Sequence, residues 1–390
     1  MAVEIKKVES KADFKVFFEF PWRLYADDPY WTPMLLSMRH EILDKKKNPS
    51  WEYMEGDYYV AWRGNVPVGT IAAFVNHRHN EFRHENIAWF GFFETIDDQE
   101  VATALLNTAA QWATDHGYDA LRGPQSFTTH EECGLLVDGF DRPVMLMPYN
   151  YPYYQKLVED AGFHKAMDVH SFHRVFDPQQ LEEGGQFSRL NRVVERMKSR
   201  HNITLRPINR KNLQADFKLF KDIYNEAWKD NWGFVPFTDR ELDALVHSLS
   251  QFFDPDLAIF AEVDGEAVGF VMGVPDFNQV LKAAYARPGT PEPVTMVKAL
   301  WHWKIRPKID WLRIPLMGIK EEYRKYGIVM MLVAHLVEEN LKHGVRYNHL
   351  DAGWVLETNH DLIGILEKAG MEIYRTHRFY EKPTIESPSA

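Results

Sequence analysis

The sequence predicts a mixed α/β fold in which two units of the same kind follow one another along the chain. At 390 residues, the chain is longer than one ordinary hydrophobic core supports, so two domains are expected. The segment Asp13–Phe17 reappears, with one substitution, as Asp216–Phe220, 203 positions later. Each half also carries a hairpin pattern at an offset of 200. These three observations indicate an internal tandem repeat.

Each unit is expected to open with a strand followed by a helix. Val3–Val8 alternates in the manner of an edge strand, and Ile203–Ile208 has the same place and pattern in the second half. The repeated Asp-Phe-Lys segments follow these strands in both halves.

A β-hairpin comes next in each half. The first runs from Tyr58 to Phe74 with Gly64-Asn65 at its turn, and the second runs from Ala258 to Val274 with Asp264-Gly265 at its turn. Both dipeptides suit a tight hairpin turn.

A strand, a long helix, another strand, a short helix and a last strand complete each unit. Asp97–Glu100 is expected to cap the first long helix, which Gly117 would end, and Gly344 would end the second. The halves differ by two insertions, Gly123–Tyr149 and Asn278–Ile314. Such additions usually lie over a binding face and shape it.

Three domain ranges follow from the repeat. Residues 1–178 form the first unit, residues 179–200 a linker and a basic helix, and residues 201–390 the second unit. The linker is placed where Pro, Gln, Glu and Gly-Gly cluster, and the helix Ser188–Arg200 is basic and amphipathic.

The composition is that of a globular protein, with 45% hydrophobic and 14% aromatic residues. The net charge is −11, so no nucleic acid is expected as the main partner, and an anionic cofactor would need a local binding device.

Three further features indicate a cytoplasmic location. The apolar run Ile328–Val337 is far shorter than the ~20 residues that span a membrane. The first residues lack the apolar region of a secretory signal. The single cysteine, Cys133, fits a reducing compartment.

The most informative segment is the turn between a strand and the long helix of the second half. Leu316–Ile319 is apolar, a short basic loop with Arg324, Lys325 and one glycine follows, and an apolar helix begins at once. Free amide groups at a helix N-terminus favour anions, and the two cations add to this. The sequence therefore predicts a phosphate-binding turn.

This turn carries a family resemblance. Arg324-x-x-Gly327-x-Val329 resembles the Arg/Gln-x-x-Gly-x-Gly/Ala loop of the GCN5-related N-acetyltransferase superfamily, and the order of elements in both halves is similar to that fold. The resemblance implies two tandem acyl-CoA N-acyltransferase-like units, with acetyl-CoA or another acyl-CoA as co-substrate. The implied coenzyme-binding residues are Met317, Gly318, Ile319, Arg324, Lys325, Tyr326, Gly327, Ile328, Val329 and Asn359.

The chain also departs from the family pattern. Val329 stands where the loop has a small residue, and Leu366 and Val158 stand where many members have a tyrosine general acid. The first half's equivalent of the loop, Phe90–Asp98, is acidic where phosphates would lie. We therefore expect the first unit to be a degenerate copy that supports the fold or contributes to the acceptor site.

His349 and Asp351 are the candidate catalytic residues. They alternate on one face of a strand after the long helix. Either side chain could receive the proton of an acceptor amine, directly or through a water. The alternative is a buried hydrogen-bonded pair or a strand-end cap.

The candidate substrate residues are Glu131, in the segment His130–Cys133, and Tyr153, in an aromatic run. For this segment a structural loop is favoured over a nucleophilic role of Cys133 with His130 as its base, because neighbours in sequence do not face one another in a strand. His77 and His79 have metal-like spacing, but nothing completes a compact ligand set, so no metal is expected.

The predicted function is transfer of an acetyl or longer acyl group from acyl-CoA to the amine or hydroxyl of a small-molecule acceptor. One alternative is a protein that binds CoA or another anion without chemistry. Another is an aminoacyl transferase built from the same units, for which the net charge is unfavourable unless a local basic face compensates. That face would be Arg189, Arg192, Arg196, Lys198 and Arg200.

Overall fold

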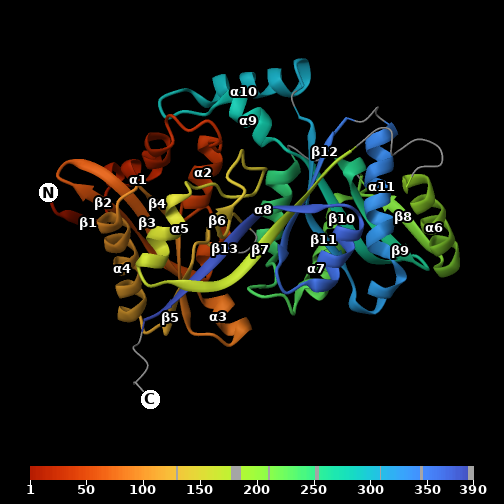
Figure 1. Cartoon of the computed structure of the whole chain (residues 1–390), viewed down its shortest axis with the longest axis horizontal. Coiled ribbons are helices and arrows are strands. Elements are labelled where there is room, and N and C mark those ends of the chain that lie inside the picture. Colours follow the sequence, from red (N-terminus) through yellow and green to blue (C-terminus); the bar gives the residue numbers. More distant parts are fainter. Residues whose placement is uncertain are drawn as a thin grey trace.

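The computed structural model of the chain describes residues 1–128, 131–176, 186–209, 211–250, 254–307, 309–342 and 346–384. The predicted linker thus lies mostly outside the described residues, and so do His130 and Gly344. The fold is mixed α/β, as expected, and one sheet runs through both halves (Figure 1).

The described strands of the first half are β1 (Val3–Lys7), β2 (Met54–Arg63), β3 (Val66–Asn76), β4 (Ile87–Thr95), β5 (Ala120–Gly123), β6 (Leu135–Asp138) and β7 (His164–Val175). Those of the second half are β8 (Ile203–Pro207), β9 (Ala258–Val263), β10 (Glu266–Pro275), β11 (Trp311–Ile319), β12 (His349–Leu356) and β13 (Glu372–Pro383). The main strand order is β1-β2-β3-β4-β5-β13-β7-β12-β11-β10-β9-β8, and β6 also pairs with β13.

The helices of the first half are α1 (Lys11–Leu24), α2 (Leu36–Leu43), α3 (His77–Arg83), α4 (Gln99–Asp115) and α5 (Tyr153–Asp160), and α6 (Gln186–His201) joins the halves. The second half has α7 (Leu213–Trp228), α8 (Asp239–Ser250), α9 (Asn278–Ala284), α10 (Glu292–Leu300), α11 (Ile328–Lys342) and α12 (His360–Lys368). The short helical turns are η1 (Pro49–Glu52), η3 (Pro255–Leu257), η4 (Trp301–Ile305) and η5 (Glu321–Tyr326). The predicted order of elements is confirmed in both halves.

The two halves exchange their last strands. β5 of the first half pairs with β13, and β12 of the second half pairs with β7. β7 and β13 pair with each other at the centre. The sheet therefore crosses the predicted unit boundary, and each half uses a strand from the other.

Local sequence signals explain the hairpins and the ends of the helices. The first hairpin turns at Gly64 (φ 63°), and the second turns at Asp264 and Gly265 (φ 50° and 85°), as predicted. Gly117 adopts φ 79° just after α4. Glycine adopts such backbone angles freely, and aspartate tolerates them better than most residues, so these positions fix where the elements stop.

The two long helices each cover a core. α4 lies at one end of the molecule and α11 near the other (Figure 1). Leu105, Leu106 and Ala109 of α4 are fully buried in the first-half core, and Ile328, Met331 and Leu332 of α11 are fully buried in the second-half core. Burial of these faces positions the N-terminus of each helix at the end of the preceding strand.

Candidate active site

β11 and β12 run side by side only over their first residues. Trp311–Ile314 pairs with His349–Ala352 in parallel, and beyond this the two strands part. Among the described strands, none pairs with Pro315–Ile319 on the side that faces β12. A free strand edge of this kind can pair with an extended amide-containing ligand.

Aromatic side chains border this opening. The indole nitrogen of Trp228 donates a hydrogen bond to the carbonyl of Met317 at 3.2 Å, and the rings of Trp228 and Trp354 lie 6.2 Å apart. A Cβ added to Gly318 would lie 2.9 Å from the Phe270 ring. The Met317 carbonyl thus already has one partner, although its oxygen can accept a second hydrogen bond.

Gly327 forms the turn between η5 and α11. Its φ is 73°, and its carbonyl accepts hydrogen bonds from the amides of Met330 and Met331 at 3.1 and 3.3 Å. The amides of Ile328 and Val329 come before Met330, the first amide with an acceptor inside this turn of the helix, so the helix itself offers them no partner. The Val329 side chain packs against the core of the second half. This is the geometry of an anion site at a helix N-terminus.

Cations and the linker helix surround this turn. Arg324 and Lys325 are exposed, and the Arg324 guanidinium donates to the Ala227 carbonyl at 3.0 Å. On α6, His201 stacks on Tyr326 with 4.5 Å between ring centres, and a Cβ on Gly327 would lie 2.1 Å from the Met197 methyl. A basic face on α6 was expected, but no local sequence signal indicates that this helix lies against the loop.

Asn359, the last of the predicted coenzyme-binding residues, caps α12. Its side-chain oxygen accepts a hydrogen bond from the Leu362 amide at 3.2 Å. A role beside the pantetheine arm of a coenzyme stays a prediction.

The equivalent turn of the first half is closed by a carboxylate. Asp98 accepts hydrogen bonds from the amides of Glu100 and Val101 at 3.0 and 3.4 Å, and it pairs with Arg63 at 2.7 Å. The hydrogen bond from Arg63 lowers the pKa of Asp98, so this carboxyl is ionised at neutral pH. The first-half helix therefore satisfies its amides with its own anion.

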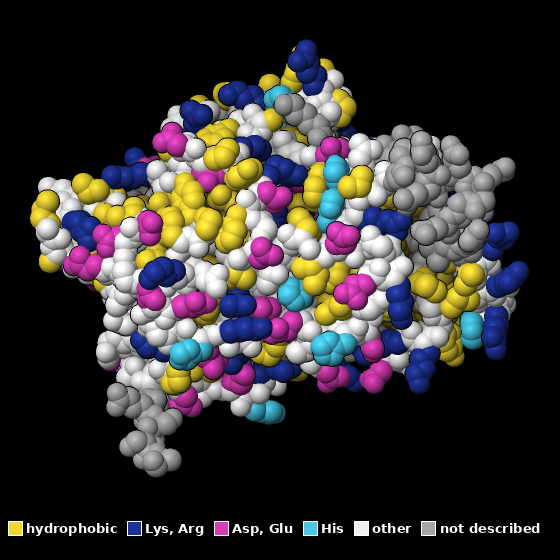
Figure 2. Space-filling model, viewed as in Figure 1, with side chains coloured by type: hydrophobic (Ala, Val, Ile, Leu, Met, Phe, Trp, Pro, Cys, Tyr) yellow, Lys and Arg dark blue, Asp and Glu magenta, His cyan; other side chains and the backbone are white. Residues whose placement is uncertain are grey.

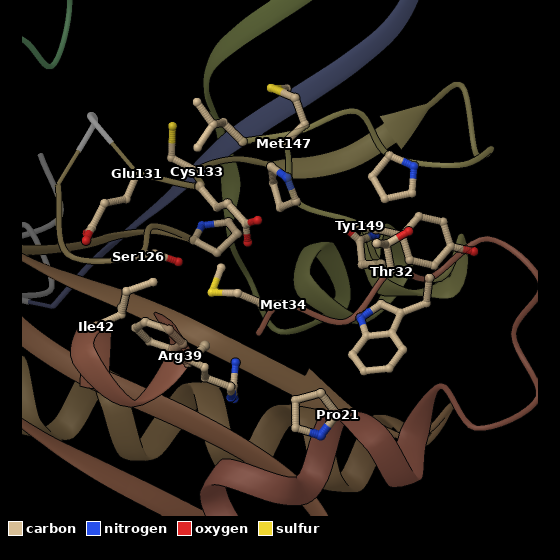
Figure 3. A pocket seen from close by; sticks show the side chains of 18 of the residues that line it. Pro21, Thr32, Met34, Arg39, Ile42, Ser126, Glu131, Cys133, Met147 and Tyr149 are labelled. Carbon is tan, nitrogen blue, oxygen red and sulfur yellow. The ribbon is translucent and has the colours of Figure 1, made fainter. Parts of the chain in front are cut away.

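A cavity of ≈ 190 Å³ lies in the first half, between the end of β4 and the inserted segment that follows β5 (Figure 3). Residues of α9, from the insertion of the second half, also line it. Both predicted insertions thus border a binding space. The apolar lining includes Trp22, Trp31, Met34, Met38, Ile42, Phe92, Met145, Leu146, Met147 and Leu281.

Charged side chains also line this cavity, and burial shifts their pKa values. Burial raises the pKa of Glu131 to about 8 and of Glu94 to about 7, and it raises the pKa of Glu132 as well. Glu94 accepts hydrogen bonds from the hydroxyls of Tyr25 and Tyr154 at 2.7 and 2.8 Å. The sequence pointed only to Glu131, because residues that meet here are far apart along the chain.

Arg39 is the cationic residue of the lining. Its Nε donates to the Phe18 carbonyl at 3.1 Å, and among the described residues no carboxylate lies within 4.0 Å of its guanidinium. Burial lowers its pKa, while Glu94 and Glu132 act in the opposite direction. Among the described residues of the lining, three carboxyls therefore face one guanidinium.

The candidate catalytic residues lie at the start of β12, where Asp351 is buried and His349 is half-buried. Asp351 is fully buried and accepts hydrogen bonds from Arg313 and Tyr374, both at 2.7 Å. His349 and His173 share a hydrogen bond of 3.0 Å. Both carboxylate oxygens of Asp351 are thus engaged, which favours the alternative of a buried hydrogen-bonded group, and the catalytic roles stay predictions.

The other predicted substrate residue lies outside the cavity lining. The Tyr153 hydroxyl donates to the Thr95 carbonyl at 2.8 Å, at the closed turn of the first half. His79, from the metal-like pattern, shares a 2.8 Å hydrogen bond with Glu85. Among the described residues, no group of three His, Cys, Asp or Glu side chains is arranged to hold a metal ion.

Comparisons with known proteins match both halves. The sequence model described as "Acetyltransferase (GNAT) family" matches residues 19–123 and 217–371. Protein YghO of Escherichia coli (strain K12) is 32% identical over 377 residues, which cover 96% of this chain and 93% of that protein. Bacterial ceramide synthase of Caulobacter vibrioides is 32% identical over 381 residues, which cover 96% of each chain.

Solved structures share the whole fold. A tandem GNAT protein from the clavulanic acid biosynthesis pathway gives a TM-score of 0.56 at 12% identity, over 99% of this chain and 100% of its own. A GCN5-related N-acetyltransferase from Sphaerobacter thermophilus gives 0.51 at 12% identity, over 100% and 98% of the two chains. None of the described helices is long and apolar enough to cross a membrane.

Proposed function

The chain belongs to the acetyltransferase (GNAT) family, and on that premise we propose that it is an acyl-CoA-dependent N-acyltransferase whose coenzyme lies on the second half. The observation that carries this proposal is the pair of amides at Ile328 and Val329, to which no described residue offers an acceptor, next to Gly327 and two exposed cations. At the corresponding helix N-terminus of the first half, Asp98 accepts hydrogen bonds from the amides of Glu100 and Val101.

The residues of the second half fit such a coenzyme. The amides of Ile328 and Val329, with Arg324 and Lys325, would hold its pyrophosphate. The free edge of Pro315–Ile319 would pair with its amide-containing arm. When bound, the coenzyme supplies an acyl group activated as a thioester.

An amine is the acceptor that we propose. Its nitrogen forms the new C–N bond with the thioester carbonyl, the C–S bond breaks, and the proton lost by the amine balances the released thiol. Positioning of the two reactants would supply most of the acceleration. The name of the Caulobacter relative supports an amine acceptor, because a ceramide is the amide of a fatty acid with a long-chain amino alcohol. We therefore propose a long acyl chain rather than acetyl.

A second candidate is a protein that binds the coenzyme without chemistry. The engagement of both Asp351 oxygens favours it, because no free carboxylate at that position is ready to accept a proton. Release of free thiol from a long-chain acyl-CoA, dependent on an added long-chain amino alcohol, separates the two candidates.

Calorimetry with acetyl-CoA and with a long-chain acyl-CoA tests coenzyme binding. We expect both to bind and the double variant Arg324→Ala/Lys325→Ala to weaken binding by about ten- to a hundredfold, at ~1 kcal/mol or more for each charged contact. Arg346→Ala removes an exposed cation elsewhere in the same half and serves as the matched control. Equal weakening by the control, or no binding to the wild type, would reject the proposal.

A further inference from the structure

The first-half cavity does not suit the phosphates of a coenzyme. Asp98 already accepts from amides of the nearby helix, and the described lining offers a polyphosphate one guanidinium against three carboxyls, too few cationic partners to hold it. The cavity is nevertheless large, since ≈ 190 Å³ accommodates on the order of a dozen water-sized groups.

The walls suit a flexible aliphatic chain. Four methionines line the space, namely Met34, Met38, Met145 and Met147. Methionine is unbranched and polarisable, so it adapts to chains of variable shape. Figure 3 shows Met34 near the middle of the cavity lining and Met147 at its upper edge, with Glu131 and Ser126 toward one end and Thr32 and Tyr149 toward the other.

The charges favour a cationic head group. Glu131 has a single described contact from its side chain, at 3.3 Å from the Thr128 amide, and no described residue donates to the Glu132 side chain. Arg39 lies near Glu94 and Glu132 but forms no ion pair among the described residues. An ammonium group beside Glu131 and Glu132 would supply the missing partner.

We propose that this cavity binds a long-chain primary amine, with its ammonium at Glu131 and Glu132 and its aliphatic chain along the methionine walls. The inference rests on the proposed N-acyltransferase function, for which it names the acceptor class and its binding site.

The end of the cavity that carries Glu131 and Glu132 lies toward the second half, which supports delivery of the amine to that half. Gln125 lines the cavity and also a smaller pocket, in which Gly233, Val235 and Glu241 of the second half take part. Gly233 and Val235 belong to the segment that follows α7, whose Trp228 borders the opening at β11. The ammonium group of the bound amine would therefore lie close to the smaller pocket that residues of both halves line.

Calorimetry with dodecylamine, butylamine and dodecanoate, below their micelle-forming concentrations, tests this assignment. We expect dodecylamine to bind at least a hundredfold more tightly than butylamine, because each buried methylene contributes about fourfold. We also expect it to bind at least tenfold more tightly than dodecanoate. Tighter binding of dodecanoate, or no dependence on chain length, would overturn the proposal.

Two variants locate the site. Met34→Trp fills the cavity and is expected to weaken dodecylamine binding at least tenfold. Glu132→Gln is expected to weaken it about fivefold and to leave dodecanoate binding unchanged or tighter. Glu372→Gln, at an exposed carboxyl on β13, is the control. Normal binding by both cavity variants would overturn the assignment.

Failure of this inference is distinguishable from failure of the proposed function. Acyl-CoA binding that depends on Arg324 and Lys325, without dodecylamine binding, rejects the cavity assignment alone. Dodecylamine binding without acyl-CoA binding rejects the proposed function and leaves the amine site.

A second observation concerns the outer surface of α10 and η4, which project from the molecule near its upper edge (Figure 1). The apolar side chains there are Val294, Met296, Val297, Leu300, Trp301 and Ile305, with exposed fractions of 47%, 41%, 70%, 53%, 48% and 61%. These six account for nearly half of the thirteen exposed large hydrophobic side chains among the described residues. Such a patch marks an interaction site.

Cations accompany this patch. Lys298, Lys304 and Arg306 are exposed, and Lys282 and Arg287 precede them in the insertion. Over residues 282–306 the only acidic residue is Glu292, although the chain as a whole carries a net charge of −11. Figure 2 shows Lys and Arg side chains beside hydrophobic ones at the upper edge of this face. An apolar face with surrounding cations is complementary to an anionic lipid surface.

We infer that α10 and η4 rest on the surface of an anionic membrane. The neighbouring helix α9 carries Leu281, which lines the first-half cavity, so the docked face lies next to an element of the cavity wall.

Co-sedimentation with vesicles tests this second inference. We expect binding to vesicles of phosphatidylcholine with phosphatidylglycerol, little binding to pure phosphatidylcholine, and weakening by salt. Val297→Glu/Trp301→Glu should reduce binding at least tenfold, and Lys298→Glu should reduce it at least fivefold. Val66→Glu, at a valine that is 45% exposed on the first hairpin, is the control. Absence of binding to anionic vesicles, or a dimer in solution that Val297→Glu/Trp301→Glu dissociates, would overturn it.

Discussion

At the end of β4 the chain places Asp98 ahead of α4, and at the end of β11 it places Gly327 ahead of α11. The elements on either side are equivalent, since each turn joins a strand to a long helix of the same repeat. In the first half the carboxylate accepts the helix amides and pairs with Arg63. In the second half Gly327 has no side chain, and no described residue offers an acceptor to the Ile328 and Val329 amides. One side chain thus decides whether a helix N-terminus stabilises the fold or is open to an anion.

The largest effect is expected from substitution of Asp351. This variant tests whether the second half contributes chemistry as well as binding. Asp351→Ala leaves the buried Arg313 with the Gly353 carbonyl but without its carboxylate partner, so we expect a loss of about 3–5 kcal/mol in the free energy of unfolding, measured with urea. Tyr374→Phe removes only one hydrogen bond to the same carboxylate and should cost about 1 kcal/mol. A hundredfold loss of turnover with unchanged stability would instead show a catalytic role.

The next effect comes from making the second turn resemble the first. Gly327→Asp adds a carboxylate at the N-terminus of α11, and we expect acyl-CoA binding to weaken at least a hundredfold, or about 2.7 kcal/mol. Gly327→Asn has nearly the same shape and meets the same Met197 contact without the charge. Calorimetry should therefore show a smaller loss for Asn. Equal losses would assign the effect to shape alone.

The reverse change in the first half is expected to affect stability and not binding. Asp98→Ala removes a helix cap and an ion pair with Arg63, so we expect a loss of about 1–2 kcal/mol in the free energy of unfolding. The affinity for acyl-CoA should stay within twofold of the wild type. A gain of a second coenzyme site in this variant would contradict the division between the halves.

The smallest expected effect is a pH dependence of stability that arises from a carboxyl of the first half. Burial raises the pKa of Glu131 from 4.5 to about 8. The unfolded chain releases this proton near pH 4.5 and the folded chain near pH 8, so this group lowers stability as the pH rises between these values. Glu131→Gln should flatten that part of a melting-temperature profile. An unchanged slope would show that Glu131 is not buried as described.

Much of this comparison could be predicted from the sequence, because it depends on local signals. The hairpin turns, the order of elements, the acidic turn before α4 and the glycine turn before α11 each occupy a few neighbouring residues. Periodicity and capping report such short segments directly.

Contacts between distant segments could not be predicted in this way. The exchange of β7 and β13 depends on which strand edges remain free once both halves have folded. Neither strand has a local sequence signal that identifies its pairing partner. Arg39 and Glu132 meet in one cavity although 92 residues lie between them. The packing of Met197 against Gly327 likewise joins a linker helix to a loop more than a hundred positions later.

Hydrogen–deuterium exchange with and without a long-chain acyl-CoA tests the central claim most directly, because it reads the amides of both turns in one experiment. We expect added acyl-CoA to slow exchange in peptides that cover residues 324–333 and to leave residues 96–103 unchanged. Slower exchange at residues 96–103, or no change at either turn under saturating acyl-CoA, would contradict the account.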